Sequence, residues 1–247
     1  MPRANRNFCK GYVWHITHRC HRKSFLLKFA RDRRRWRHWL FEARRRHNLS
    51  VLNYIVTSNH IHLLCADRGN GEISQSMQLI SARTAQEFNN RKGRKGAFWD
   101  DRFHATAVQT DSHLSRCIAY IDLNMVRARA VEHPGEWDIC GYNEIQSPWT
   151  RKGVIDFECL MKLLNVGSKS ELAVLQNEQI SEDVSNTQRD PKWTESVAVG
   201  DERFLQEIKA VLAFRGIHRE ITSDADAWIL REDRCRYLAF SGPKLAD

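Results

Sequence analysis

The stretch of sequence that decides the fold is VLNYIVTSNHIHLLC, residues 51–65. Residues 51–56 and 60–65 are rich in β-branched, aromatic and aliphatic side chains, which favour extended strands. The three residues between them, Thr-Ser-Asn at 57–59, are typical of a tight turn. Two such runs joined by so short a connection predict a β-hairpin.

Two histidines, His60 and His62, lie in the second strand of this hairpin. Because successive side chains of a strand point to opposite faces, both imidazoles project from one face, and Ile61 and Leu63 project from the other. Paired imidazoles are common metal ligands, but histidines in strands also have structural roles. The strand alone leaves both interpretations open.

The segments around the hairpin complete the order β-α-β-β-α-β, followed by one more helix. This is the split β-α-β arrangement of a ferredoxin-like α+β domain, in which two helices cover one face of an antiparallel sheet. The expected elements are a strand over residues 12–18, a helix from about residue 25, a helix over 73–90, a strand over 103–109 and a helix from residue 111 or 112 to about 129.

Beyond residue 148 the hydrophobic pattern weakens. Residues 157–164 and 204–214 have helical spacing, and residues 176–190 are polar enough for a linker. The sequence therefore predicts a first domain over residues 1–148 and a mostly helical C-terminal extension over 149–247.

The charge is concentrated in the first part of the chain. The net charge is +9 overall; residues 1–150 carry 25 Lys and Arg against 13 Asp and Glu, a net of +12, and residues 151–247 a net of −3. The first helix is rich in arginine, including Arg34 and Arg35, whose planar guanidinium groups suit phosphate contacts. This surface predicts nucleic-acid binding, with a solvated helix face as the alternative.

Cysteine usage and hydropathy narrow the class of protein further. The seven cysteines are scattered and form no C-x-x-C pair, so neither a disulfide scaffold nor a zinc ribbon is expected. No apolar run is long enough to span a membrane, and the N-terminus has no signal-peptide core. We expect a cytoplasmic protein, either a monomer or a homodimer.

Residues 58–64, SNHIHLL, resemble the histidine motif of the HUH endonucleases, most closely the single-tyrosine transposases and their REP-associated relatives. Further segments resemble this family in the same order, and the resemblance covers roughly residues 8 to 145. They are residues 14–19 (WHITHR), 96–103 (GAFWDDRF) and 119–128 (AYIDLNMVRA).

The resemblance implies a specific chemistry. Tyr120 would be the nucleophile, and His60, His62 and Asn124 would hold Mg²⁺ or Mn²⁺. Asn124 follows Tyr120 by one helical turn, so both side chains can reach one site. Attack on single-stranded DNA would leave a 5′ phosphate on Tyr120 and release a 3′ hydroxyl, and the implied substrate contains an imperfect, REP-like hairpin.

Five arginines are candidates for holding the DNA backbone. Arg102 and Arg127 lie near the implied catalytic residues in sequence, although either could form a surface ion pair instead. The full set of candidates is Arg19, Arg34, Arg35, Arg102 and Arg127. His15, His18 and His104 are weaker metal candidates. The segment WTESVAVG, residues 193–200, resembles a C-terminal segment of some REP-associated members, where it would recognise a hairpin or regulate the active site.

Two other functions are consistent with the sequence. A domesticated relative would bind DNA hairpins without cutting them. A small-molecule enzyme would use His60 and His62 with a cysteine to bind zinc, but Cys65 is three residues after His62 and faces the other side of the strand.

Overall fold

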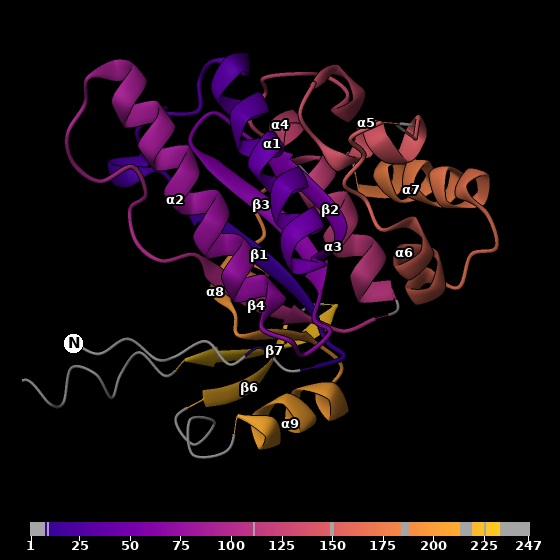
Figure 1. Cartoon of the computed structure of the whole chain (residues 1–247). Helices are drawn as coiled ribbons and strands as arrows, with labels where there is room; N and C mark the ends of the chain where they lie inside the picture. The colour runs from indigo at the N-terminus through magenta and orange to yellow at the C-terminus, as the bar shows by residue number, and fades with distance from the viewer. Residues whose placement is uncertain are drawn as a thin grey trace, which may run out of the picture.

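The computed structural model describes residue 8 and residues 10–232, except residues 111, 149–150, 184–187, 213–218 and 225. Its first half has the expected order of strands and helices (Figure 1). The elements are β1 (Val13–Arg19), a 3-10 turn η1 (His21–Lys23), α1 (Ala30–His47), β2 (Ser50–Val56), β3 (His60–Ala66), α2 (Glu72–Lys92) and β4 (His104–Val108).

The first four strands form an antiparallel sheet in the order β2-β3-β1-β4. In its centre, His62 of β3 stands opposite Thr17 of β1 on one side and Ile55 of β2 on the other. This order and pairing confirm the ferredoxin-like arrangement and the hairpin over residues 51–65.

The two faces of the sheet are covered by different helices. Tyr54 of β2 accepts a hydrogen bond from Arg37 of α1 at 2.8 Å, so its side chain points toward α1 and α2, which lie side by side (Figure 1). Asn53, its neighbour, points the other way and donates to the carboxylate of Asp122, at the end of α3 (Ser112–Asp122), at 2.9 Å. Neighbouring side chains of β2 therefore point to opposite faces of the sheet, one covered by α1 and α2 and the other by α3.

The helix expected to run to about residue 129 is divided in two. After α3, Leu123 has a ψ of 2°, and a short helix α4 (Asn124–Arg127) follows. The amide of Leu123 still donates to the carbonyl of Ala119, and the amide of Arg127 donates to Leu123, each at 2.9 Å. The path of the chain is thus nearly that of a continuous helix, and Tyr120 and Asn124 remain one turn apart.

The described residues of the C-terminal part are largely helical but also include strands β5, β6 and β7, which the sequence did not predict. Strand β5 pairs in parallel with β4, and β7 and β6 extend the sheet, so that its strands within the described residues follow the order β2-β3-β1-β4-β5-β7-β6. The later elements are a 3-10 turn η2 (Pro134–Glu136), α5 (Gly141–Gln146), α6 (Phe157–Leu164), α7 (Lys169–Asp183), α8 (Lys192–Glu195), β5 (Ala198–Gly200), α9 (Glu202–Val211), β6 (Arg219–Asp224) and β7 (Ala227–Glu232).

The region expected to be a polar linker, residues 176–190, is partly helical. Helix α7 extends to Asp183 and buries Leu172, Gln176 and Ile180, which recur every four residues on one face. Between residues 176 and 183 the other positions of this helix are polar, and this composition accounts for the linker prediction. Residues 184–187 of that range lie outside the described residues.

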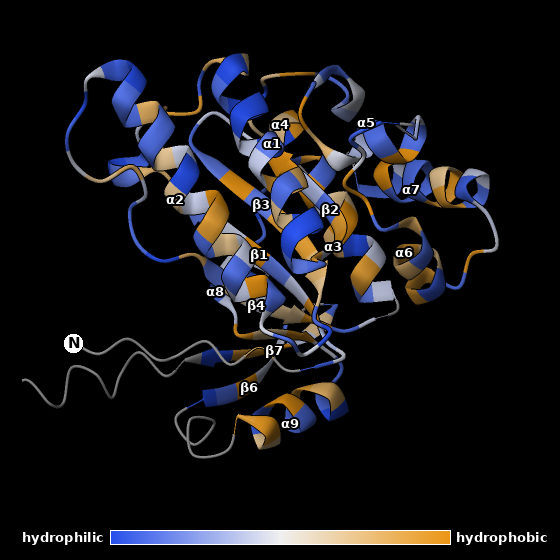
Figure 2. Cartoon of the chain, viewed as in Figure 1, coloured by the Kyte–Doolittle hydropathy of each residue, from blue (hydrophilic) through white to orange (hydrophobic). Residues whose placement is uncertain are grey.

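Hydrophilic residues are common along the helices of the described part of the chain. Figure 2 shows hydrophilic residues distributed along the two longest helices, α1 and α2. Among the helices in the described ranges, none combines the length and the apolar character needed to cross a membrane.

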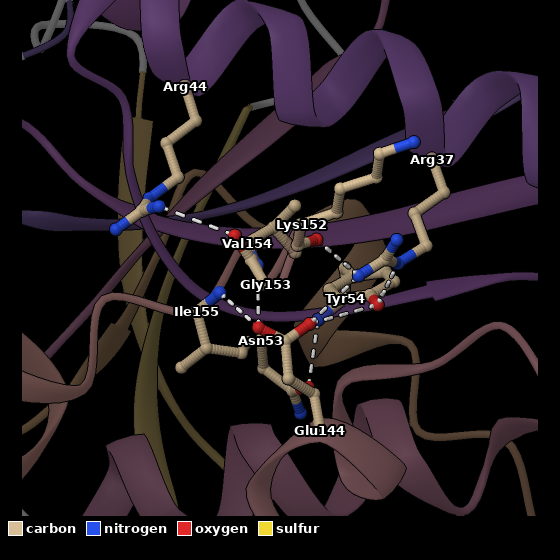
Figure 3. Close-up of polar contacts among 9 residues, drawn as sticks. All are labelled: Arg37, Arg44, Asn53, Tyr54, Glu144, Lys152, Gly153, Val154 and Ile155. Atoms are coloured by element: carbon tan, nitrogen blue, oxygen red, sulfur yellow. Dashed lines mark hydrogen bonds and ion pairs between the residues drawn. The ribbon is translucent and has the colours of Figure 1, made fainter. Parts of the chain in front are cut away.

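A buried carboxylate ties the C-terminal part to the sheet (Figure 3). The Glu144 side chain of α5 is fully buried and accepts hydrogen bonds from the amides of Val154 and Ile155 at 2.6 and 2.8 Å. It also pairs with Arg37 of α1 at 3.3 Å and contacts the Tyr54 hydroxyl. The division into domains at residue 148 stays a prediction, but these contacts cross it.

Candidate active site

The hairpin places the two histidines on the face covered by α3. The ring centroids of His60 and His62 are 5.0 Å apart, whereas Ile61 and Leu63 are fully buried on the opposite face. The His62 ring lies 5.9 Å from the ring of Tyr120, centroid to centroid. The strand alternation therefore brings the histidine pair to the helix that carries the expected nucleophile.

Asn124 joins this group from α4. Its amide nitrogen lies 3.0 Å from His62 Nε2 and donates a hydrogen bond to it. His60, His62, Tyr120 and Asn124 all line one cavity of about 530 Å³. The four residues that the family resemblance singled out are thus gathered in one place, from three elements.

The turn before β3 determines which nitrogen of His60 faces the cavity. Asn59 donates through its side-chain nitrogen to the carbonyl of Lys23 at 3.2 Å, which leaves its side-chain oxygen 2.7 Å from His60 Nδ1. Because that oxygen can only accept, His60 Nδ1 carries the hydrogen. The unprotonated Nε2 of His60 is then available to a cation.

Burial keeps both histidines neutral. It lowers the pKa of His60 to about 4, with a smaller contribution from the charge of Arg19, and it lowers the pKa of His62 well below 6.5. Neutral imidazole is the form that binds metal ions. Two imidazole nitrogens and the amide oxygen of Asn124, after a half-turn of its amide, form a donor set for Mg²⁺ or Mn²⁺ with positions left for phosphate and water.

The donor set contains no cysteine or carboxylate. Among the described residues, no group of three or more His, Cys, Asp or Glu side chains is placed to hold a metal. The buried thiol of Cys65 donates to the carbonyl of Trp14 at 3.7 Å, on the strand next to β3. The geometry therefore does not support the alternative zinc site.

Tyr120 is held by Arg127. The guanidinium carbon of Arg127 lies 4.3 Å from the centre of the Tyr120 ring, and its Nη2 donates to the backbone carbonyl of Tyr120. Tyr120 is 7% exposed, and burial raises the pKa of its phenol, while the positive charges of Arg127 and Arg189 oppose that rise. Arg127 thus orients the ring and favours its ionised form.

The arginine candidates fall into two groups. Arg19, Arg102 and Arg127 line the cavity. Arg34 and Arg35 lie on α1, across the sheet from Tyr120, and Arg35 is occupied by a two-pronged ion pair with Glu87 at 2.7 and 2.8 Å. The structure therefore brings three of the five candidates to the site and leaves two on the other side.

The C-terminal segment contributes residues that sequence reasoning did not place here. Arg189, Thr194 and Glu195 line the cavity, and Arg189 bonds to the side chains of the other two at 2.9 and 2.8 Å. For Thr194 and Glu195 the available signal was the resemblance of residues 193–200 to a family segment, which gave no position in the fold. Arg189 lies in the range expected to be a polar linker, and no signal in the sequence pointed to it.

The three weaker histidine candidates do not join the donor set. His18 stacks on Trp99 at 4.1 Å between centroids, and its Nε2 donates to the carbonyl of Asp101. His104 contacts the carbonyl of Ser196 at 2.9 Å. His15 is buried beside His62, with its Nε2 2.8 Å from His62 Nδ1, so it contacts a candidate ligand rather than the cavity.

A family model and solved structures of other proteins match this chain. The family described as "Transposase IS200 like" matches residues 9–124, which contain all four central residues. The chain is similar to the solved structure of a REP-associated tyrosine transposase bound to a REP hairpin, with a TM-score of 0.50 and 22% identity, covering 64% of this chain and 95% of that one.

A second solved structure, a transposase candidate from Deinococcus radiodurans, is 11% identical, with a TM-score of 0.33, over 43% of this chain and 86% of that one. No protein with a curated description matches the sequence.

Proposed function

Residues 9–124 belong to the IS200-like transposase family, and we propose that the protein cuts and rejoins single-stranded DNA with Tyr120 as the nucleophile. One observation carries the proposal: Tyr120 shares a single cavity with His60, His62 and Asn124. A tyrosine hydroxyl is a weak nucleophile alone and needs nearby positive charge to react with a phosphate.

The proposed cofactor is Mg²⁺ or Mn²⁺ held by the Nε2 atoms of His60 and His62 and by the side-chain oxygen of Asn124. When bound, such an ion polarises the scissile phosphate and stabilises the negative charge that develops on its oxygens. The protein residues supply the ligand geometry, and the histidines are neutral before the ion arrives.

The proposed step is a transfer of the phosphoryl group from DNA to tyrosine. The Tyr120 oxygen forms a bond to phosphorus, the bond from phosphorus to the 3′ oxygen breaks, and the phenol proton is replaced overall by one on the released 3′ hydroxyl. Arg127 holds the ring, and Arg19 and Arg102 lie where they can pair with phosphate oxygens. Because the product is again a phosphodiester, rejoining by a 3′ hydroxyl needs no ATP.

The proposed substrate is single-stranded DNA that contains a hairpin. The support is the fold shared with the hairpin-bound transposase and the arginines that line the cavity. Contacts to phosphates release counterions, so the logarithm of the binding constant should fall linearly with the logarithm of salt concentration.

A covalent adduct tests the proposal. Wild-type protein incubated with labelled hairpin-bearing single strands and Mn²⁺ should give a protein–DNA band that resists denaturation, and EDTA should abolish it. Tyr120→Phe should give none. Tyr142→Phe is the matched control, because Tyr142 is a buried tyrosine whose hydroxyl donates to Asn177 at 2.8 Å, away from the cavity.

Equal adduct yields from wild type and Tyr120→Phe would show that Tyr120 is not the nucleophile. Salt-sensitive hairpin binding with no adduct under either metal would instead favour a domesticated DNA-binding protein without cleavage activity.

A further inference from the structure

His15 connects the candidate metal site to the C-terminal segment through two hydrogen bonds. It lies on β1 and is fully buried. Its Nδ1 is 2.8 Å from the backbone carbonyl of Trp193 in α8, and its Nε2 is 2.8 Å from His62 Nδ1. The chain of contacts therefore runs from α8, through β1, to a candidate metal ligand on β3.

The hydrogens in this chain can be assigned from one end. The Trp193 carbonyl can only accept, so His15 Nδ1 must donate. A buried His15 whose hydrogen-bond partners are a carbonyl and a neutral imidazole is itself neutral, because an uncompensated buried charge is costly. Its Nε2 is then an acceptor, and His62 Nδ1 must carry the hydrogen.

The assignment also agrees with the far side of the His62 ring. If Nδ1 carries the single hydrogen of a neutral imidazole, Nε2 holds a lone pair. Nε2 accepts the hydrogen bond from the Asn124 amide at 3.0 Å, which requires that lone pair. In the other tautomer, Nε2–H would point at the cation site and exclude a metal.

We propose that His15 is a positioning residue that fixes His62 in the Nδ1–H tautomer and directs its Nε2 to the cation. The inference rests on the proposed metal site. Metal-binding histidines commonly donate their second ring N–H to a fixed acceptor, and loss of that acceptor weakens metal binding by about 10- to 100-fold. Here the acceptor is another imidazole, held in turn by a backbone carbonyl.

The two candidate ligands are therefore oriented in different ways. His60 is oriented by Asn59 in its own turn, whereas His62 depends on a carbonyl 178 residues from His15 in sequence. Thr106 of β4 helps hold the segment that carries this carbonyl, because its hydroxyl donates to the carbonyl of Ser196 at 2.7 Å and lies 3.3 Å from the carbonyl oxygen of Trp193. Correct orientation of His62 thus requires the C-terminal segment to be docked on β4.

The direct test is the tautomeric state of His62 in full-length, metal-free protein labelled with ¹⁵N-histidine. Long-range ¹H–¹⁵N spectra distinguish the two tautomers. Wild type should show the hydrogen on His62 Nδ1. A wild-type signal from Nε2–H would overturn the inference without any variant being made.

Two substitutions of His15 separate positioning from packing. His15→Gln can accept from His62 Nδ1 and donate to the Trp193 carbonyl, so the tautomer should persist, with a Mn²⁺ dissociation constant within about threefold of wild type. His15→Leu fills similar space but cannot accept, so the tautomers should mix and Mn²⁺ binding should weaken by about 10- to 100-fold.

His133→Gln is the control, because His133 lies outside the cavity, where its ring accepts a hydrogen bond from the Gly135 amide at 3.1 Å. Unchanged His62 tautomer and Mn²⁺ affinity in His15→Leu would refute the inference. The measurements need no DNA, so a wild type that binds Mn²⁺ through His62 but forms no adduct would refute the proposed function and leave this role of His15 intact.

Discussion

Replacing Asp122 with asparagine should change how the stability of the protein depends on pH. Asp122 ends α3, is 1% exposed, and accepts hydrogen bonds from Asn53 at 2.9 Å and from Gln176 of α7 at 2.7 Å. Burial raises the pKa of its carboxyl from 3.8 to about 7, although the two hydrogen bonds oppose the rise. The carboxyl therefore ionises near neutral pH in the folded protein and near pH 4 in the unfolded chain.

The direction of the effect follows from which state binds the proton more tightly. Between pH 4 and 7 the folded state holds the proton and the unfolded state does not, so this group stabilises the folded state at low pH and the stabilisation is lost as pH rises through 7. Between pH 5 and pH 8 this change is confined mainly to the two pH units below 7. The free energy of unfolding should therefore fall by roughly 2 to 3 kcal/mol from pH 5 to pH 8.

The assay is urea unfolding of metal-free protein in EDTA at pH 5 and pH 8, for wild type and Asp122→Asn. Asn53 and Gln176 donate to different oxygens of the Asp122 carboxylate, and asparagine has only one oxygen. The variant therefore loses a hydrogen bond, and this loss of stability is the same at both pH values and cancels in the comparison. The unfolding free energy of wild type relative to the variant should fall by roughly 2 to 3 kcal/mol from pH 5 to pH 8. Asp138→Asn, at an exposed position, is the control. If the unfolding free energies of wild type and Asp122→Asn differ by the same amount at pH 5 and pH 8, the reasoning is refuted.

Three further substitutions test other parts of the molecule. Glu144→Ala leaves Arg37 and two backbone amides without their buried acceptor, so the free energy of unfolding in urea should fall by about 3 to 5 kcal/mol. Glu158→Ala, at an exposed position, is the control. An equal loss of stability in the two variants would contradict the role of the buried network. Arg127→Lys keeps the charge but loses the planar stacking on Tyr120, so adduct formation should slow by about tenfold with Mn²⁺ affinity unchanged, and a wild-type rate would exclude this role. Arg102→Ala should reduce the slope of log affinity for single-stranded DNA against log salt by about one. Arg35→Ala should leave the slope unchanged, because Arg35 is already paired with Glu87. Equal slopes for the two variants would contradict the assignment of the cavity as the DNA path.

The parts of the fold and site that could be predicted are those encoded by local patterns. Alternation in residues 51–65 placed His60 and His62 on one face, and helical spacing placed Tyr120 and Asn124 together. These relations depend only on neighbours in sequence and on the repeat of a strand or helix. They survived even the break of the helix at Leu123, because the helical hydrogen bonds continue through it.

The parts that could not be predicted depend on contacts between distant segments. Strand β5 has only three residues, Ala198–Gly200, and its pairing is decided by the free edge of β4 rather than by its own pattern. Arg35 has the same sequence signal as a phosphate-binding arginine, but Glu87 of α2 occupies it. The proposed role of His15 depends on the backbone carbonyl of Trp193, and the position of a backbone carbonyl cannot be inferred from the residue types in a sequence.

The most direct test of the proposed chemistry is to identify the covalent linkage itself. After reaction with a hairpin-bearing strand and Mn²⁺, nuclease and protease digestion followed by tandem mass spectrometry should find a nucleotide joined through its 5′ phosphate to the tyrosine of the peptide that contains Tyr120. A nucleotide attached to another residue, or joined through a 3′ phosphate, would contradict the proposed role of Tyr120.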